Sequence, residues 1–465
     1  MNRPIPLAVV QNSGESLYEA QAKIYPREID GRFARLRIIA VFVLLGLFYL
    51  LPWVRWDGHQ AVLFDLPARK FYVFGLTFWP QDFFWLACLL IIAAITLFFF
   101  TALAGRLWCG YACPQTVWTE VFLWIERFCE GRRNQRIKLD GGNWTREKIL
   151  RKSAKQFLWI TLSLWTGFTF VGFFTPILDL GHAAASFSLS GWEGFWVVFY
   201  GFATYGNAGY MREQVCKYMC PYARFQSAMF DRDTLIISYD EARGEPRGAR
   251  KRSADPKALG LGDCIDCEAC VQVCPTGIDI RDGLQIECIA CAACVDACDS
   301  VMDKMAYPRG LIRYTTESTL AGLGRRILRP RTAIYATILT ALIVAFAWGV
   351  SHRAALIVDV LHDRNALYRE MADGGIENGY TIKLVNKTDQ TQQLLIALDG
   401  DNSALRIVGK TRVTVQPGQV GNVPLTLHAD RDAIKGRRRV GLLVRNDDDS
   451  IHVQHTSEFF APEEK

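Results

Sequence analysis

The residues whose types and spacing point most directly to chemistry are the cysteines, of which the 465-residue chain has 14. Eight of them form two runs with the spacing C-x-x-C-x-x-C-x-x-x-C. Bacterial ferredoxins with two 4Fe-4S clusters use this spacing, and in them three cysteines of each run bind one cluster while the fourth binds the other. The rule assigns one cluster to Cys264, Cys267, Cys270 and Cys298, and the other to Cys288, Cys291, Cys294 and Cys274.

A zinc ribbon is the main alternative for these two runs, but it would use two separated C-x-x-C pairs rather than a triple spacing. Pro275 follows the first run, as in ferredoxins, whereas Asp299 follows the second. This difference removes no ligand. We expect it to alter only the potential or the exposure of one cluster.

A second group of cysteines lies in two copies of the motif C-x-Tyr-x-Cys-Pro, each directly after an apolar segment. This duplication indicates two repeats related by an axis along the membrane normal, which would bring four thiols together. Such a set could bind Cu(I), another soft metal or an iron-sulfur centre, or cycle between dithiol and disulfide. Simple packing is the alternative, and the repeated tyrosine and proline favour a functional site. The residues concerned are Cys109, Cys113, Cys216 and Cys220.

The remaining candidates for metal or cofactor chemistry are weak. Cys88 and Cys129 are single, and we expect them to pack as apolar residues. No histidine falls inside an apolar segment and no C-x-x-C-H motif occurs, so no haem is expected. The glycine pattern is too poor for a flavin or nicotinamide site, so electrons must come from a separate donor. His452 and His455 would point to opposite faces of a strand rather than bind one metal.

Composition places these motifs in a membrane protein. Half of the residues are hydrophobic and 22% are charged, yet the mean hydropathy is only +0.09, so very apolar and polar stretches must alternate. Five apolar segments approach the ~20 residues that cross a bilayer as a helix. The first lacks the features of a cleaved signal peptide and is expected to be a retained anchor. The predicted spans are residues 38–53, 83–103, 157–175, 192–210 and 332–350.

Lysine and arginine predict the orientation of these spans, because positive loops stay in the cytoplasm. Residues 105–155 are rich in both, whereas residues 176–191 contain neither. The bias places residues 1–34, 105–155 and 211–331 in the cytoplasm and 351–465 in the periplasm. The net charge of +6 therefore reflects topology and not nucleic-acid binding. The fourth predicted span contains four glycines, which interrupt its apolar run. If this segment does not cross the membrane, the predicted orientation of all later residues is inverted.

The tail from residue 380 to residue 462 consists of short alternating runs separated by turn clusters, which predicts about seven strands in an immunoglobulin-like sandwich. The expected fold is thus a multi-domain membrane protein with an α-helical bundle of about five transmembrane helices, a cytoplasmic two-cluster 4Fe-4S ferredoxin domain and a C-terminal all-β immunoglobulin-like sandwich. The expected divisions are an N-terminal segment (1–34), a four-helix transmembrane region (35–240), a basic linker (241–262), the ferredoxin domain (263–310), a connector (311–331), the fifth helix (332–350), a second connector (351–378) and the sandwich (379–465).

In this combination the chain resembles the cytochrome c oxidase accessory proteins of the CcoG, FixG or RdxA type. The resemblance covers nearly the whole chain and rests on residues 108–115 (WCGYACPQ), residues 216–222 (CKYMCPY), the linker at 243–247 (RGEPR), the ferredoxin cysteines and the sandwich-like tail. It implies a bacterial inner-membrane protein that reduces Cu(II) to Cu(I) during assembly of the copper centre of cbb-type oxidases. It also implies oxidase assembly factors or subunits as partners.

The residues by themselves indicate a membrane electron carrier with a paired thiolate site. On the combined interpretation, a cytoplasmic donor reduces the two clusters, which pass electrons to Cu(II) held at or near the four C-x-Tyr-x-Cys-Pro thiols. The partners are then this donor, copper ions and membrane lipid, with no nucleic acid. Two alternatives remain open, namely an electron-transfer subunit serving quinone or a periplasmic partner, and a non-enzymatic assembly scaffold.

Overall fold

The computed structural model describes residues 23–462, except residues 57, 257, 364–365, 389, 401–403 and 431–432. Most of the predicted N-terminal segment (1–34) and small parts of the predicted linker and turns therefore lie outside the described residues. The chain divides into two compact units. The first comprises the residues up to Gly46, Phe100–Trp165 and Tyr200–Thr332, and the second comprises Leu47–Phe99, Thr166–Phe199 and the residues from Ala333 onward.

Among the described residues, three helices are long and apolar enough to cross a membrane: Arg32–Trp53, Phe83–Ala104 and Pro330–Ser351. They correspond to α1 (Arg32–Leu50) with its 3-10 turn (Leu51–Trp53), to α2 (Phe83–Ala104) and to α14 (Pro330–Ser351). Little of their surface is buried, as expected for helices that face lipid. The first, second and fifth predicted spans are confirmed as helices of this kind.

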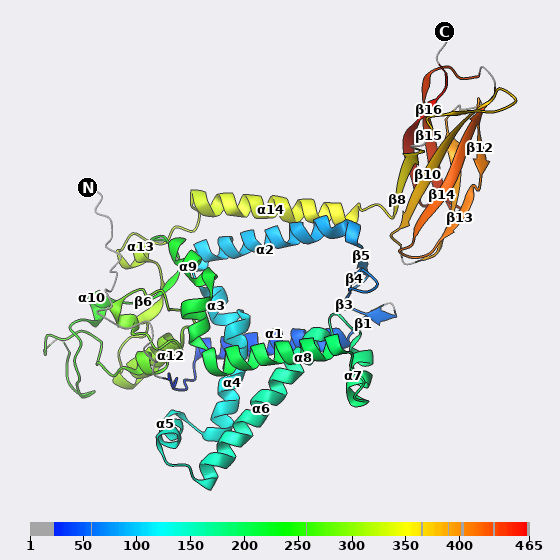
Figure 1. Ribbon diagram of the computed structural model, residues 1–465. Helices are drawn as coiled ribbons and strands as arrows, with labels where there is room; N and C mark the ends of the chain where they lie inside the picture. The colour runs from blue at the N-terminus through cyan, green and yellow to red at the C-terminus, as the bar shows by residue number, and fades with distance from the viewer. Residues whose placement is uncertain are drawn as a thin grey trace. The chain divides into compact units, whose positions relative to one another are not determined.

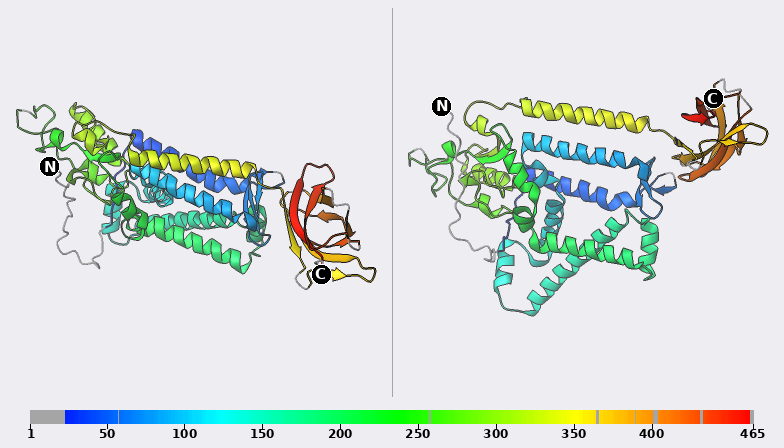
Figure 2. Two further views of the ribbon diagram at one scale, coloured as in Figure 1. Left: turned by 90° about the horizontal axis from the view of Figure 1, so that it is seen from above. Right: turned by 45° about the horizontal axis from the view of Figure 1, so that its top comes forward.

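Within the second unit, α14 runs antiparallel beside α2 (Figures 1 and 2). The rings of Trp85 and Phe346 lie 5.7 Å apart. Gly349 faces Trp85 so closely that a side chain there would overlap the indole ring. A small residue therefore allows these two apolar helices to approach each other.

The other two predicted spans are helical but do not meet the same requirements of length and apolarity. The third lies in α6 (Arg146–Val171), whose first three turns carry five basic residues and whose remainder includes serine, threonine and tryptophan. The fourth lies in α8 (Gly191–Thr204), which has 14 residues and then continues as a π-helix (η3, Tyr205–Met211). The prediction of five spans is thus confirmed for three of them.

Several basic residues that the sequence assigned to positive cytoplasmic loops form buried ion pairs in the first unit. Glu126 is fully buried in α4 (Pro114–Glu130) and binds Arg136 of α5 (Arg133–Gly141) at 3.3 Å. Arg212, which follows η3, binds the same carboxylate at 2.8 Å. Glu130 is also fully buried and lies 2.8 Å from Lys155 of α6. The charged loop therefore folds as a packed structure joined by ion pairs.

Replacing Glu126 by glutamine is expected to destabilise the protein by about 3 to 5 kcal/mol, because Arg136 and Arg212 would keep buried charges without a counter-charge. The matched control is Glu147→Gln, whose side chain is 69% exposed and pairs with Arg151 in an i,i+4 surface ion pair, so its loss should be below ~1 kcal/mol. Thermal unfolding followed by circular dichroism measures both. Equal melting temperatures for the two variants would contradict the role of Glu126.

The same ion pairs predict how stability depends on pH. Burial by itself raises the pKa of Glu126, but the surrounding cations, with Arg212 the strongest, outweigh burial and lower the pKa to about 2. A folded pKa below the usual value of 4.5 means that the charge on Glu126 stabilises the fold fully above that pH. This contribution is lost as the pH falls toward 2.

The ferredoxin part of the first unit is built around two antiparallel strands, β6 (Ile236–Tyr239) and β7 (Ile312–Thr315). They pack with α11 (Ala269–Gln272), the 3-10 turn Ile280–Asp282 and α12 (Ala293–Met305) around one apolar core that includes several cysteines. Both strands lie outside the predicted boundaries of 263–310. Their short length and the intervening basic linker concealed them in the sequence.

The C-terminal part is a sandwich of two antiparallel sheets around one apolar core, which confirms the predicted architecture (Figure 1). One sheet has the order β12-β14-β10-β8, with β9 paired to β10, and the other has the order β13-β11-β15-β16. The strands are β8 (Leu356–His362), β9 (Arg369–Glu370), β10 (Ile376–Asn386), β11 (Gln392–Asp399), β12 (Leu405–Gly409), β13 (Arg412–Val415), β14 (Val420–Ala429), β15 (Arg437–Asn446) and β16 (His452–Phe460).

The sandwich begins at Leu356 and not at residue 379, so the predicted connector 351–378 is wrong over this stretch. β8 pairs with β10 along its whole length and buries alternate residues, Leu356, Val358 and Val360. In β16, His455 pairs with the inward-facing Leu442, whereas His452 pairs with the exposed Arg445. The two histidines therefore lie on opposite faces.

Smaller elements occupy the remaining connections. The segment between α1 and α2 forms two small antiparallel sheets, and α7 (Ile177–Ala185) lies between α6 and α8. The strands of these sheets are β1 (Arg55–Trp56), β2 (His59–Gln60), β3 (Val62–Asp65), β4 (Lys70–Val73) and β5 (Leu76–Phe78). The other short helices are α3 (Leu107–Tyr111), the π-helix η4 (Val215–Met219), α9 (Pro221–Ala228), α10 (Glu241–Gly244) and α13 (Glu317–Leu320).

Candidate metal and iron-sulfur sites

The two C-x-Tyr-x-Cys-Pro motifs have the same local structure. In each, the first cysteine lies in a short helical segment, α3 for Cys109 and η4 for Cys216. The second cysteine, Cys113 or Cys220, has an extended backbone and caps the next helix, α4 or α9. The proline then occupies the first helical position, where its missing N–H group leaves no hydrogen bond unmade. The motif is therefore a helix-break-helix element that occurs twice.

The four motif thiols lie close enough in the first unit to influence one another. Burial raises the pKa of Cys109 to about 12, and the thiols of Cys113, Cys216 and Cys220 add to this effect while Arg106 opposes it. Burial likewise raises the pKa of Cys216 to about 11. The thiols of Cys109 and Cys216 are therefore protonated at pH 7, and a soft metal ion would have to displace their protons.

A fully buried glutamine contacts this thiol group. Gln226, in α9, accepts a hydrogen bond from the Cys109 thiol through Oε1 at 3.3 Å. Its Nε2 has no hydrogen-bond partner among the described residues. The site thus holds a buried donor next to the sulfur atoms, where an anionic thiolate or a bound ligand would be stabilised by it.

The two ferredoxin runs also share their backbone geometry. Asp266 and Glu268 flank Cys267 with φ angles of 54° and 52°, and Ala290 and Ala292 flank Cys291 with 54° and 59°. The left-handed region costs a non-glycine residue about 1 kcal/mol or more. Four such residues at matching positions indicate loops bent to turn three thiols toward one point.

Two cavities border these loops, and their linings match the two predicted cluster sites. Cys264, Cys267, Cys270 and Cys298 all line one of them. Cys274, Cys288, Cys291 and Cys294 line the other, together with Cys270. Burial raises the pKa of Cys270, Cys288 and Cys298 to about 12. Four thiols around an apolar cavity are the donor set that a 4Fe-4S cluster needs, so the residues fit this group.

In the described part of the chain, no three cysteine, histidine or acidic side chains stand at metal-ligand distances. Asp299 lies within α12, where its carboxylate accepts a hydrogen bond from the Gly310 N–H at 3.0 Å. A proline at this position would remove a helical hydrogen bond, whereas Pro275 follows the end of α11.

Arg106 and Gly110 place the first C-x-Tyr-x-Cys-Pro motif in contact with the second ferredoxin run. Arg106 is 4% exposed and donates hydrogen bonds to the carbonyls of Ile286, Cys288 and Ala223. Gly110 lies against the same loop, since a Cβ there would be 2.8 Å from the carbonyl oxygens of both residues 289 and 290. The α3 backbone thus contacts the cluster loop directly.

The sequence does not predict this contact. Arg106 lies in the lysine- and arginine-rich segment 105–155, and no motif assigns a role to Gly110 or Gln226. A glycine between two motif cysteines is a weak signal of close backbone approach. No sequence pattern shows which loop it would approach, because that loop lies about 180 residues further along the chain.

The variant Gly110→Ala is expected to push α3 away from the cluster loop, because both neighbouring atoms at 2.8 Å belong to the backbone and cannot rotate aside. Overpacking of this kind costs about 1 to 3 kcal/mol. Electron paramagnetic resonance (EPR) of the reduced protein should show a changed cluster signal. Gly141→Ala is the control, since a Cβ at Gly141 has no atom within 4 Å. Identical spectra and melting temperatures for the two variants would refute the contact.

Comparison with known families supports an iron-sulfur protein. Residues 211–317 match the family model of a 4Fe-4S dicluster domain, and residues 82–133 match that of a 4Fe-4S binding domain. The second match contains Cys109 and Cys113, so a cluster is also a candidate occupant of the C-x-Tyr-x-Cys-Pro thiols. Residues 346–462 match the immunoglobulin-like fold at the C-terminus of FixG.

The nitrogen fixation protein FixG of Rhizobium meliloti is 40% identical over 449 residues, which cover 87% of this chain and 86% of that protein. Protein RdxA of Cereibacter sphaeroides is 41% identical over 402 residues, covering 83% and 84% of the two chains. Protein RdxB of the same organism is 40% identical over 423 residues, covering 86% and 87%.

The crystal structure of a FixG-related protein from Vibrio parahaemolyticus aligns with 23% of this chain and 97% of that one, at 29% identity and a TM-score of 0.22. The sequence matches, the cysteine sites, the apolar helices and the C-terminal sandwich agree with one another along the chain. The protein belongs to the FixG and RdxA family of membrane iron-sulfur proteins.

Proposed function

We propose that this protein reduces Cu(II) to Cu(I) at the inner membrane, for assembly of the copper centre of a cbb-type cytochrome c oxidase. The observation that supports this best is the contact of Gly110, which lies between two of the four motif cysteines, with a ferredoxin loop in the same compact unit. Thiolate sulfur is a soft ligand that favours Cu(I) over Cu(II), so binding at these thiols assists the reduction. Copper as the substrate is implied by the resemblance to the oxidase accessory proteins of the CcoG, FixG or RdxA type.

The chain's own residues have separate roles in this proposal. Cys264, Cys267, Cys270 and Cys298 hold one 4Fe-4S cluster, and Cys288, Cys291, Cys294 and Cys274 hold the other. Bound clusters supply single-electron transfer, and each copper takes up one electron from a one-electron donor on the cytoplasmic side. Cys109, Cys113, Cys216 and Cys220 hold the copper.

Arg106 and Gly110 have positioning roles. Arg106 holds the cluster loop by donating hydrogen bonds to the carbonyl groups of Ile286 and Cys288. Its positive charge also lies beside both sets of thiols. Gly110 permits the backbone contact that keeps the two sites near each other. The C-terminal sandwich is proposed to dock oxidase subunits or assembly factors on the opposite side of the membrane.

The proposed topology has five spans, with residues 105–155 and 211–331 in the cytoplasm and residues 351–465 in the periplasm. An alkaline phosphatase reporter fused at residue 400 is expected to be active, because this enzyme folds only in the oxidising periplasm. A green fluorescent protein reporter at the same position should be dark. The reverse result would mean an even number of spans before the sandwich.

An electron-transfer subunit is the second candidate, and the 4Fe-4S family match over residues 82–133 favours it. The two functions differ in their electron acceptor. Purified full-length protein, reduced with dithionite and freed of excess reductant, should convert Cu(II) to Cu(I) detected with bicinchoninate. Reduction of a quinone analogue but not of Cu(II) would support the second candidate. Reduction of neither would exclude both and leave an assembly scaffold.

A further inference from the structure

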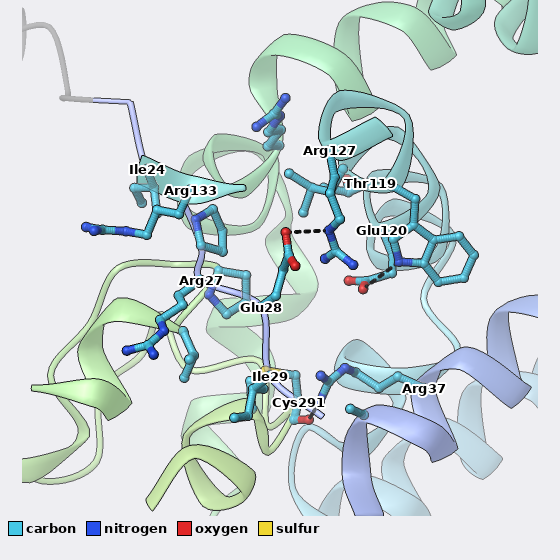
Figure 3. A pocket seen from close by; sticks show the side chains of 18 of the residues that line it. Ile24, Arg27, Glu28, Ile29, Arg37, Thr119, Glu120, Arg127, Arg133 and Cys291 are labelled. Carbon is cyan, nitrogen blue, oxygen red and sulfur yellow. Dashed lines mark hydrogen bonds and ion pairs between the residues drawn. The ribbon is translucent and has the colours of Figure 1, made fainter. Parts of the chain in front are cut away.

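A cavity of about 790 Å³ in the first unit has no role in the copper proposal (Figure 3). Its walls come from the segment before α1, from α1 itself, from α4, from the start of α5, from residues 212–216 and from both ferredoxin runs. Cys216 and Cys291 both line it, so it borders the C-x-Tyr-x-Cys-Pro thiols and one cluster loop. Cavities of this size enclose cofactor-sized ligands.

Positive charge dominates the walls of this cavity, which contain seven arginines and four acidic residues. Some of the arginines are already engaged. Arg127 forms an ion pair with Glu28 at 2.7 Å, and Arg37 donates a hydrogen bond to the Cys291 carbonyl (Figure 3). These contacts connect elements that line the cavity. The excess positive charge therefore lies on the other arginines.

The excess charge is concentrated on arginines with free guanidinium groups. The guanidinium groups of Arg27 and Arg132 make no hydrogen bond or ion pair with any described residue. Arg133 engages only its Nε with the described residues, by donating to the Tyr25 carbonyl at 2.8 Å. Arg136 is 2% exposed, and its Nε has no partner among the described residues although its other nitrogens are bonded. A buried arginine nitrogen of this kind can donate to a further acceptor, which water or a ligand can supply.

The start of α5 reinforces this preference for an anion. Arg133 is the first residue of α5, a helix of nine residues, and Arg132 caps it. The N–H group of Arg132 already donates to Gln135 Oε1 at 2.9 Å, but the helix dipole at this N-terminus still favours negative charge. The planar fork of arginine matches the oxygen atoms of phosphate, which lysine cannot contact in the same bidentate way.

The cavity also has an apolar side. Ile38 of α1 and Leu123 and Trp124 of α4 line it, and the Trp124 indole is held by a 3.1 Å hydrogen bond to Glu120. The lining thus suits a molecule that joins a phosphate group to an apolar or aromatic body. Topological charge bias accounts for the number of arginines in this loop, but not for unpaired guanidinium groups gathered around one cavity.

We propose that this cavity binds a phosphate-bearing amphipathic anion beside the cluster loop. Two sources share this chemistry, a free nucleotide and the headgroup of an anionic phospholipid. A nucleotide would reach the cavity from solution, whereas a phospholipid would enter from the bilayer next to α1. The proposal does not depend on copper chemistry.

The experiment uses full-length protein in phosphatidylcholine nanodiscs, with ADP binding measured by calorimetry and phosphatidylglycerol retention measured by native mass spectrometry. The test variant is the double change Arg27→Ala and Arg132→Ala, which removes two guanidinium groups without breaking a described contact. The matched control is Arg146→Ala with Arg325→Ala, which removes the same charge from two arginines outside the cavity lining that make no side-chain contact with a described residue.

Wild-type and control proteins should bind one of the two probes, and the cavity variant should bind it at least ~10-fold more weakly because two charge-assisted contacts are lost. Loss of ADP binding identifies a nucleotide, and loss of phosphatidylglycerol retention identifies a lipid headgroup. Failure of wild-type protein to bind either probe overturns the proposal. Equal binding by all three proteins also overturns it, because the contact would then lie outside the cavity.

Discussion

Single replacement of Cys109 or Cys220 by serine is expected to lower copper binding and Cu(II) reduction almost as far as replacement of all four motif cysteines. Ligands of one metal site act as a unit, so the loss of one thiolate removes most of the affinity, and further losses add little. Serine is the right probe because it keeps a small polar atom but supplies no thiolate. We expect a decrease of at least ~100-fold in copper affinity for either single variant.

The shared geometry of the two motifs makes this prediction specific. Cys109 and Cys220 belong to different repeats and different helices, so only a common site makes their effects equal. The controls are Cys88→Ser and Cys129→Ser, which change isolated cysteines and should leave copper reduction intact. The 4Fe-4S absorbance should survive in every variant. Additive losses across the series, or normal reduction by the quadruple variant, would place the copper site elsewhere.

The second large effect is expected at the exchanged ligands of the ferredoxin runs. Cys298→Ser should destroy the cluster held by the first run, because Cys298 lines the cavity of Cys264, Cys267 and Cys270. Cys274→Ser should destroy the other cluster for the corresponding reason. Each variant should lose about four of about eight iron atoms and one of two EPR signals.

The control for this pair is Ser300→Ala, which lies in α12 two residues beyond Cys298 and carries no thiol. Its iron content should equal that of the wild type. Full iron content in both cysteine variants would refute the exchange of ligands between the runs. Loss of the opposite cluster in each variant would mean that each run binds its own cluster.

Elements specified by local pattern could be predicted from the sequence. Continuous apolar runs identified α1, α2 and α14, and alternation identified the strands of the sandwich. The spacing of the ferredoxin cysteines places three thiols on one loop. Each predicted set of four lines one cavity, and Cys270 lines both cavities. These features depend on residues close together in the chain.

Features that depend on distant residues could not be predicted. β8 directly follows the apolar helix α14, and its partner strand β10 begins more than ten residues later in the chain. The sequence therefore predicts a connector over residues 351–378 instead of a strand. Glu126 and Glu130 are buried, but they lie in the basic segment 105–155, from which the sequence predicts only the membrane orientation. The third and fourth spans are ambiguous because α6 joins a charged half to an apolar half and α8 is short. Apolarity alone does not decide whether such helices cross the bilayer.

The identity of the group held by Cys109, Cys113, Cys216 and Cys220 decides between copper chemistry and simple electron transfer. The most direct measurement is the content of iron, acid-labile sulfide and copper in anaerobically purified full-length protein, after equilibration with Cu(I) and removal of unbound metal. The account predicts about eight iron atoms per chain, together with bound copper that is missing from the quadruple serine variant. About twelve iron atoms with no bound copper would contradict it, because the four thiols would then hold a third cluster.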